Sequence, residues 1–359
     1  MAGRVARHGA RGLLATVVVL VVLVIGAGPA LACGGILDAR GSVQLARTTT
    51  LAAYHAGVEH YVTSFEYRGG GAKFGSITPL PAVPTKVERG GDWTLQRLVR
   101  ETAPAFERVA AAGVAQSAAD KAEVLLTAKV DALDLTVLRG GGMAVGTWAR
   151  EHGFGLPPDA PEVLDFYAER SPIFLASSFD PTRVANRGQQ VGDGTPVHLT
   201  IPTTNPWVPL RILGLGLQGG DKVEADVYLL TDRKPAMLPR PGQGMRLEQS
   251  RAAGPQLLSD LRSDRGMEWM PERGMWLSYL KIDTTAGALK HDLAIDSSGQ
   301  GSPSRLAAGL PVHAANPIVD AAEAASSAAN RLILPAALTG VAAIAMLLLV
   351  PRLLRKPTR

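Results

Sequence analysis

The sequence has little cysteine and few aromatic residues. Cys33 is the one cysteine among 359 residues, so no disulfide can form within the chain, even in an oxidising compartment. Aromatic residues make up 5% of the chain. Because so few are present, most of them are expected in a hydrophobic core, and that core must hold the folded part together.

Several catalytic motifs are also absent. No G-x-S-x-G, H-E-x-x-H or P-loop string occurs, which excludes the local signatures of three large enzyme classes. Ser278 and Lys281 match S-x-x-K, but the S-D-N and K-T-G partner motifs of penicillin-binding enzymes are missing. The alternating pattern around them places the two side chains on opposite faces of a strand. A catalytic set assembled from residues distant in sequence stays open.

Charged residues are missing from two segments, one near each end. Residues 13–25 follow three arginines and precede Ala30 and Ala32, which have the small-x-small spacing of a signal-peptide cleavage site. A basic start, a short apolar core and a small-residue exit are typical of a secretory signal peptide. The thirteen apolar residues are too few to cross hydrocarbon about 30 Å thick. Residues 1–32 are therefore predicted to be a cleaved signal peptide.

The second uncharged segment, residues 332–350, is long enough to cross a membrane. Its nineteen residues would extend roughly 28 Å as a helix. The tail at residues 351–359 holds four cations and no anion, which favours a cytoplasmic location. The sequence thus predicts one C-terminal transmembrane helix in a single-pass protein of the cell membrane. Its ectodomain is expected outside and its C-terminus in the cytoplasm.

The positive net charge belongs to these two ends. The chain carries 37 Lys and Arg against 32 Asp and Glu, a formal charge of +5. Every acidic residue lies between Asp38 and Glu323, whereas eight of the basic residues lie in the signal, at Arg331 or in the tail. Removing those eight leaves 29 basic against 32 acidic residues, so the exported part carries about −3. Nucleic acid is excluded as a partner, because its phosphates require a basic surface.

The middle of the chain has the pattern of an α+β domain that is β-rich with a few short helices. A turn at Ala56-Gly57 between alternating runs predicts a β-hairpin over residues 42–67. Asp92 is the expected N-cap of a helix over residues 93–109, which Pro104 should kink or split. Further helices are expected at residues 143–151, 160–170 and 256–262. Further strands are expected at residues 74–80, 130–138, 173–178, 197–201, 210–217, 223–231, 275–284 and 290–295.

The extracytoplasmic domain is placed at residues 33–296. It forms either one body or two lobes, near residues 33–150 and 151–296. Residues 232–272 are rich in Pro, Gly, Arg and Met and are expected to form a long excursion ordered only in part. Residues 297–331 have the Ala, Ser, Gly and Pro composition of a stalk.

Three glycines, Gly214, Gly216 and Gly219, match the G-x-G-x-x-G pattern of dinucleotide-binding folds. That motif requires a helix after it, because the helix N-terminus approaches the pyrophosphate. Residues 223–231 alternate as a strand instead. We therefore interpret the glycines as part of a tight hairpin, and we expect no dinucleotide and no other cofactor.

Two histidines in the predicted hairpin, His55 and His60, are candidates for a metal site with Glu59 between them. Zinc requires three or four convergent ligands. The three residues are expected to diverge across the turn, and no other His or Cys stands close in sequence. We interpret the two histidines as surface or rim residues and expect no metal.

Aromatic residues are the second candidate set. A subset of them could line a carbohydrate or peptide groove, because aromatic faces stack well on such ligands. The candidates are Trp93, Trp148, Trp207, Trp269, Trp276, Tyr54, Tyr61, Tyr67 and Tyr167.

The single cysteine poses a question of processing. Cys33 becomes the first residue of the mature chain if the signal is cut after Ala32. Lipoprotein processing requires a cysteine at that position, usually with an aliphatic residue three places before it. Here Ala30 holds that place and Leu31 follows it. Ordinary cleavage and lipidation of Cys33 both stay open.

Several segments together resemble a bacterial family of exported, membrane-anchored proteins known only as a domain of unknown function. They are the mature start Ala32-Cys33-Gly34-Gly35, the Pro-rich residues 78–84, Trp148 with the turn at residues 153–157, residues 165–167, and residues 196–199 leading to 209–212. The resemblance covers nearly the whole mature body. It implies export, a C-terminal anchor and no assigned activity, and it supplies no catalytic or binding residues.

These observations favour a non-enzymatic envelope protein. Its ectodomain is expected to bind a ligand, an envelope protein or a glycan at the outer face of the membrane. The alternative is an exported hydrolase whose site is assembled from residues distant in sequence. A deep pocket with a Ser, Asp or Glu beside a His would favour that alternative.

Overall fold

The computed structural model describes residues 35–37, 44–68, 74–103, 123–130, 133–179 and 195–312. Both uncharged end segments, Cys33 and the part of the predicted stalk beyond residue 312 lie outside the described residues. Residues up to Leu310 belong to one compact unit. No helix in the described part of the chain combines the length and the apolar character needed to cross a membrane.

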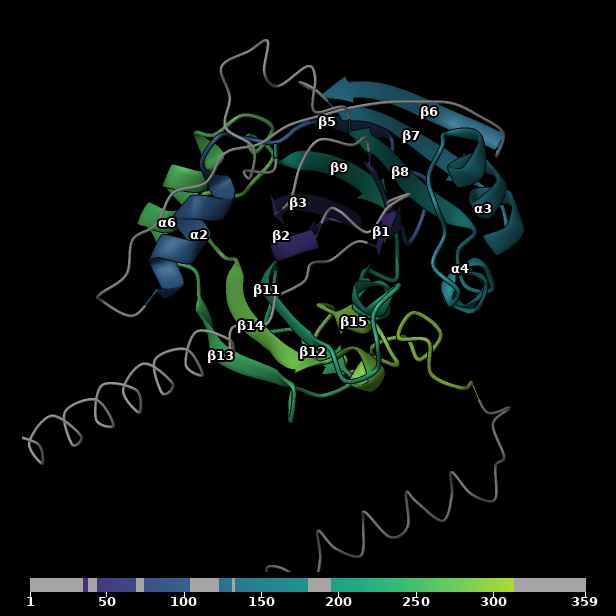
Figure 1. Ribbon diagram of the computed structural model, residues 1–359. Helices are drawn as coiled ribbons and strands as arrows, with labels where there is room; N and C mark the ends of the chain where they lie inside the picture. The colour runs from purple at the N-terminus through teal and green to yellow at the C-terminus, as the bar shows by residue number, and fades with distance from the viewer. Residues whose placement is uncertain are drawn as a thin grey trace, which may run out of the picture. The chain divides into compact units, whose positions relative to one another are not determined.

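Three sheets make up most of this unit (Figure 1). The largest has seven strands in the order β13-β14-β11-β2-β3-β9-β5, and its neighbours are antiparallel except β11 and β2, which are parallel. Its strands are β2 (Gln44–His55), β3 (Val58–Arg68), β5 (Lys86–Arg89), β9 (Val197–Pro202), β11 (Lys222–Thr231), β13 (Met245–Ala252) and β14 (Trp276–Thr285).

The other two sheets are antiparallel throughout. The five-stranded sheet has the order β1-β4-β8-β7-β6, with β1 (Gly35–Leu37), β4 (Phe74–Pro79), β6 (Glu123–Val130), β7 (Leu133–Arg139) and β8 (Ile173–Phe179). The three-stranded sheet has the order β10-β15-β12, with β10 (Trp207–Val208), β12 (Ala236–Leu238) and β15 (Leu293–Asp296).

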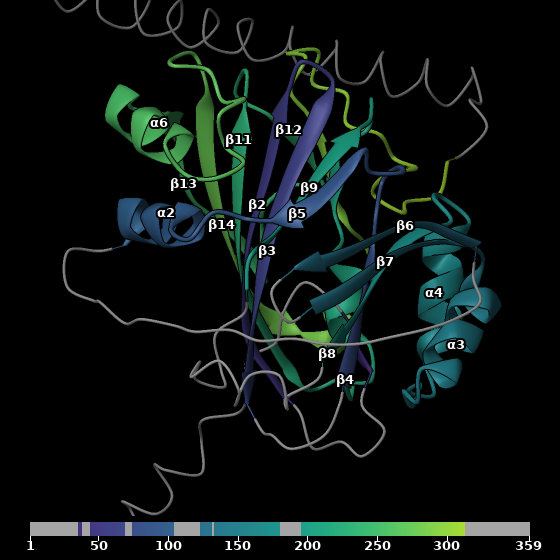
Figure 2. The ribbon, with the colours of Figure 1, turned by 90° about the horizontal axis from the view of Figure 1, so that it is seen from above.

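The two large sheets pack on each other, and helices lie outside them (Figure 2). One hydrophobic cluster joins the inner faces of the sheets and includes Leu135, Leu199 and Val227. The helices α2 and α6 cover the outer face of the seven-stranded sheet, and α3 and α4 cover that of the five-stranded sheet. Their bounds are α2 (Thr94–Thr102), α3 (Gly142–Glu151), α4 (Ala160–Ala168) and α6 (Pro255–Arg262).

The predicted hairpin is confirmed. β2 and β3 are joined by a two-residue turn in which Ala56 and Gly57 both have positive φ, 49° and 82°. A turn of this kind matches the right-handed twist of the strands it connects. Alternation then places Leu51 and Val62 on the helix-covered face, and Ala52 and Tyr61 on the inner face.

The predicted cap of α2 is wrong, although the helix is present. The carboxylate of Asp264, 4% exposed, accepts hydrogen bonds from the backbone N–H groups of Asp92 (3.1 Å), Trp93 (3.1 Å) and Thr94 (2.7 Å). A distant carboxylate thus satisfies the donors that Asp92 was expected to satisfy. A side chain at Gly91 would meet this carboxylate at 2.0 Å. The helix ends at Thr102, before Pro104, and residues 104–122 lie outside the described residues.

Two further expectations are wrong. Residues 210–217 form no strand, because a short 3-10 helix, η1 (Arg211–Gly214), occupies their centre. Residues 232–272 are described throughout and hold β12, β13 and α6. Of these three elements only α6 was predicted, because β13 is an edge strand whose side chains are largely exposed and lack a strong apolar alternation.

The compact unit crosses the boundaries drawn from the sequence. β2 pairs with β11, β3 with β9 and β4 with β8, so residues on both sides of residue 150 share each large sheet and form no separate lobes. The unit also extends past residue 296. Ala307 and Ala308 are buried, and the N–H of Asp292 donates to the carbonyl of Ala308 at 3.1 Å. The folded domain therefore includes the start of the predicted stalk.

Candidate functional site

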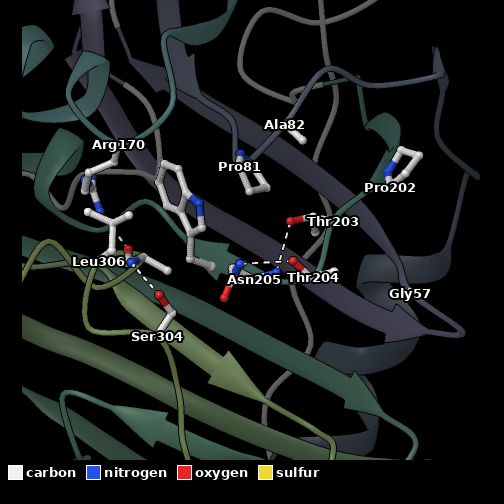
Figure 3. Close-up of a pocket in the computed structure, with 12 residues that line it drawn as sticks. Gly57, Pro81, Ala82, Arg170, Pro202, Thr203, Thr204, Asn205, Ser304 and Leu306 are labelled. Atoms are coloured by element: carbon white, nitrogen blue, oxygen red, sulfur yellow. Dashed lines mark hydrogen bonds between the residues drawn. The ribbon is translucent and has the colours of Figure 1, made fainter.

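A cavity of about 570 Å³ lies between the loop after β9, the loop after β4 and the residues following β15 (Figure 3). Arg170 and Leu306 lie at one end of it, and Gly57 and Pro202 lie at the other. Its size is within the usual range for small-ligand sites. The residues that line it are Gly57, Pro81, Ala82, Arg170, Pro202, Thr203, Thr204, Asn205, Trp207, Ser304, Leu306 and Ala307.

The loop after β9 is held by short-range and long-range hydrogen bonds. The hydroxyl of Thr203 accepts from the N–H of Asn205 at 3.1 Å, and the hydroxyl of Thr204 accepts from the side-chain amide of Asn205 at 3.0 Å. The hydroxyl of Tyr54 donates to the carbonyl of Thr203 at 2.9 Å. The hairpin and the loop are therefore tied together, and this wall of the cavity is formed in advance of any ligand.

Arg170 is the charged residue of the cavity, and its side chain is 6% exposed. The guanidinium donates to the carbonyls of Phe166 (3.1 Å) and Ala307 (2.6 Å) and to the carboxylate of Asp292 (2.5 Å). It also lies over the rings of Phe166 and Trp207, at 4.1 Å and 4.8 Å from their centroids. Arg170 is thus fixed by the protein before a ligand arrives.

Asp292 is fully buried behind Arg170. One of its oxygens accepts from the hydroxyl of Tyr167 (2.8 Å) and from the N–H groups of Leu210 (2.7 Å) and Arg211 (2.9 Å). Burial raises the pKa of Asp292, and the nearby Arg170 opposes that rise. Burial, followed by the charge of Asp292, raises the pKa of Tyr167 well above its usual value. This network explains η1, because Asp292 and Tyr167 satisfy the N-terminal donors of that short helix.

Glu59 lies beside the cavity wall and is also fully buried. Burial raises its pKa to about 8, and the backbone N–H of Trp207 opposes the rise. No side chain among the described residues donates a hydrogen bond to either of its oxygens. Burial and the nearby Glu59 in turn raise the pKa of Tyr54. Glu59 therefore carries a proton at neutral pH.

The two histidines do not diverge across the turn as predicted, and His60 is buried, whereas His55 has the partly exposed position of a rim residue, 36% exposed. His55 and His60 share one face of the hairpin, and both lie over the ring of Trp269, with centroids at 6.3 Å and 3.7 Å. His60 is 8% exposed, and its Nδ1 is 3.0 Å from Nε2 of His198. Burial lowers the pKa of His60 to about 3 and that of His198 to about 4. The described residues contain no group of three or more His, Cys, Asp or Glu arranged to hold a metal ion.

The structure also places the glycine motif and the Ser278/Lys281 motif. Gly216 has a φ of +77°, and its N–H donates to the carboxylate of Asp159. Gly214 is the last residue of η1, and Gly216 and Gly219 lie between η1 and β11. The predicted strand after the motif is therefore confirmed. The predicted hairpin is wrong, because a 3-10 helix and not a strand precedes the glycines. Ser278 and Lys281 lie on opposite faces of β14, as predicted, with Ser278 buried.

The aromatic candidates separate into core and cavity residues. Trp207 contacts the cavity, Trp269 stacks on the histidines, and Tyr54 ties the hairpin to the cavity loop. Trp148, Tyr61 and Tyr167 are buried in the core, and Trp93 and Trp276 are partly exposed. The side chain of Tyr67 lies outside the described residues.

The cavity is large enough to admit a small molecule. Its described lining has no histidine and no carboxylate. Among the described residues, none of the hydrogen bonds made by His55 or His60 joins a hydroxyl; their partners are Asp232 and His198. The condition that would favour a hydrolase is therefore not met there. The sequence analysis did not identify Arg170 or Asn205 as candidate site residues. The run of polar residues before Trp207 was the one local pattern that could have indicated Asn205.

A family model described as an uncharacterized protein conserved in bacteria (DUF2330) matches residues 27–237, which confirms the resemblance to a bacterial family of unknown function. No curated protein matches the chain. Among solved structures, the chain is similar to one titled crystal structure of baculovirus P35, with 9% identity and a TM-score of 0.38 over 73% of this chain and 99% of that chain. A likeness at that level indicates neither fold nor function.

Proposed function

The chain belongs to the DUF2330 family of bacterial proteins, and from this premise we propose that it is a single-pass envelope protein with a non-enzymatic, ligand-binding ectodomain. In this proposal residues 1–32 direct export and residues 332–350 anchor the chain in the cell membrane. The ectodomain binds an envelope protein or glycan at the outer face. The observation that carries the proposal is the cavity beside Arg170.

The state of the cavity walls supports binding rather than chemistry. Arg170, Asp292 and Tyr167 are fixed by mutual hydrogen bonds, and the loop at residues 203–205 is tied to the hairpin. Walls that are ordered before a ligand arrives reduce the entropy lost on binding. No described nucleophile and base meet in the cavity, so a bound molecule would leave unchanged.

The topology is tested by two fusions of the full chain. We expect an alkaline phosphatase reporter inserted after Val312 to be active outside the membrane, and a cytoplasm-specific fluorescent reporter after Arg359 to be active inside. N-terminal sequencing and intact mass of the purified protein locate the cut before Cys33 and detect any lipid. Activity of an external reporter placed after Arg359 would overturn the proposed orientation.

The binding role is tested by capture from native envelope. The full-length tagged chain is compared with Asn205→Trp, which fills the cavity from an exposed position, and with Gln218→Trp, a control at another exposed position outside the lining. We expect a protein or glycan partner to be retained by the wild type and Gln218→Trp and lost from Asn205→Trp. Equal recovery with all three variants would show that the cavity is not the binding site.

A further inference from the structure

We infer that the cavity takes a ligand with a carboxylate or phosphate oxyanion next to a compact apolar body. This inference rests on the proposed function, which makes the cavity the ligand site, and it adds the chemical class of the ligand. It is carried by the hydrogen-bond donors that the hydroxyls and Arg170 keep at the cavity, by the position of Arg170 and by the absence of acidic residues in the described lining.

Three hydroxyls of the lining each accept one hydrogen bond. Thr203 accepts from the N–H of Asn205, Thr204 accepts from the amide of Asn205, and Ser304 accepts from the N–H of Ala307 at 3.1 Å. A hydroxyl carries one donor in addition to its acceptor lone pairs. None of these three O–H groups donates in a hydrogen bond between described residues, so each has its donor left for a ligand.

Arg170 adds donors of greater strength. A guanidinium has five N–H groups, and Arg170 uses three of them in hydrogen bonds to described residues. Arg170 lines one end of the cavity, and its other two N–H groups make no hydrogen bond to a described residue. Hydrogen bonds from a guanidinium to an oxyanion are roughly twice as strong as those between neutral groups. Because Asp292 and three aromatic rings hold the guanidinium, little side-chain entropy is lost when a ligand binds.

The rest of the lining defines the other part of the ligand. Pro81, Ala82 and Pro202 present apolar surface, and Leu306 is 52% exposed. Leu306 lies near Arg170, whereas the two prolines and Ala82 lie across and toward the other end (Figure 3). A ligand with its oxyanion near Arg170 and a short apolar group behind it would meet both kinds of surface. A cationic ligand would find no carboxylate in the described lining.

The test uses the full-length protein in dodecyl maltoside micelles, at pH 7 and constant ionic strength, with ligand-observed NMR titrations. The probes are inorganic phosphate, isobutyrate and isobutyramide, the last a neutral match to isobutyrate. We expect saturable binding of phosphate and isobutyrate, with isobutyrate at least tenfold tighter than the amide. Thr204→Val and Ser304→Ala should each weaken isobutyrate severalfold. Thr85→Val, an exposed threonine outside the cavity, should leave it unchanged.

A second arm distinguishes a lipid headgroup from a soluble anion. The protein is placed in nanodiscs of phosphatidylcholine or of phosphatidylglycerol, and the isobutyrate titration is repeated. Loss of isobutyrate binding only with phosphatidylglycerol supports the oxyanion class and identifies a lipid as its source. Equal binding in the two nanodiscs supports the same class with a soluble source.

The outcomes separate this inference from the proposed function. If isobutyramide binds as tightly as isobutyrate, or if Thr204→Val and Ser304→Ala change nothing, the oxyanion inference is overturned and a binding cavity stands. If no probe binds while Asn205→Trp still loses its envelope partner, the oxyanion inference is likewise overturned and the binding cavity stands. If no probe binds and Asn205→Trp retains every partner, both the inference and the proposed function are overturned.

Discussion

At the scale of single residues, the fold holds two sets of buried titratable groups that respond to pH in opposite directions. Glu59 is buried on one face of the hairpin with its pKa raised to about 8. His60 and His198 are buried on the other face with their pKa values lowered to about 3 and about 4. Folding changes the pKa of each set, so the free energy of unfolding depends on pH. The direction of each pKa shift fixes whether stability is lost at high or at low pH.

Glu59→Gln should remove a loss of stability at high pH. In the unfolded chain the carboxyl titrates near 4.5, and in the folded protein near 8. The folded state therefore keeps a proton that the unfolded state has lost, and the free energy of unfolding falls as pH rises from 4.5 to 8. Glutamine keeps the shape of the protonated acid, so the variant should be more stable than wild type by up to about 5 kcal/mol at pH 9. Urea unfolding between pH 5 and pH 9 measures it.

The control for this change is Glu151→Gln, at an exposed position on α3. Its unfolding free energy should follow that of the wild type across the same pH range. A Glu59→Gln protein whose advantage over wild type does not grow between pH 5 and pH 9 would contradict the buried, protonated state of Glu59.

His60→Phe should reduce the loss of stability at low pH. His60 and His198 both titrate near 6.5 when unfolded, so the unfolded state binds more protons as pH falls below 6.5. Their stabilising contribution is complete above pH 6.5 and is lost toward pH 4 and pH 3. His55, Glu88, Lys86 and Glu268 are the charged groups that act on the pair, and they stay in place. The variant should keep the ring stack on Trp269 and lose about 1 kcal/mol less than wild type between pH 7 and pH 4.5.

Denaturant unfolding at a series of pH values measures the effect on the histidine pair. Adding His198→Phe should remove most of the remaining dependence between pH 6.5 and pH 4.5. A single variant with the same acid dependence as wild type would show that His60 does not stay neutral in the folded protein.

At the scale of elements, long-range carboxylates decide the ends of two helices. Asp264 satisfies the N-terminal donors of α2 from 170 residues away, and Asp292 satisfies donors at the start of η1 from 82 residues away. Asp264→Ala should therefore cost about 2–4 kcal/mol, because it removes bonds to three N–H groups and to the hydroxyl of Thr94. Thermal and urea unfolding measure the loss.

Asp92→Ala is the matched test of the sequence interpretation. Asp92 was the predicted N-cap, but its side chain is exposed and pairs with Arg89. Its removal should change stability by less than about 0.5 kcal/mol. A larger loss from Asp92→Ala than from Asp264→Ala would reverse the assignment of the cap.

The elements that the sequence predicted correctly are those whose signals are local. The hairpin, α4 and β14 depend on local alternation, a turn or a proline at the first helical turn, and all were found. η1 was taken for a strand because its apolar run is ambiguous until Asp292 and Tyr167 are in place. The cavity follows the same rule. Arg170 is held in position by Asp292, Trp207 and Ala307, contacts that no local pattern encodes.

At the scale of the whole molecule, the boundary of the folded domain lies beyond the one drawn from composition. Residues 297–310 have the composition of a stalk, yet they belong to the compact unit. Ala307 and Ala308 are buried, and the carbonyl of Ala307 accepts from Arg170 at 2.6 Å. A composition rich in small residues predicts a flexible segment, but small side chains also allow a segment to pack closely against a folded surface.

A truncation pair tests this boundary. An exported chain that ends after Val312 should fold and unfold cooperatively, whereas one that ends after Asp296 should lose about 3 kcal/mol or more and expose Arg170 and Asp292. The physical reason is the loss of buried alanine surface together with a hydrogen-bond acceptor for a buried guanidinium. Circular dichroism melts and resistance to protease compare the two chains. Equal melting temperatures would show that residues 297–310 contribute nothing to the fold and would restore the earlier boundary at Asp296.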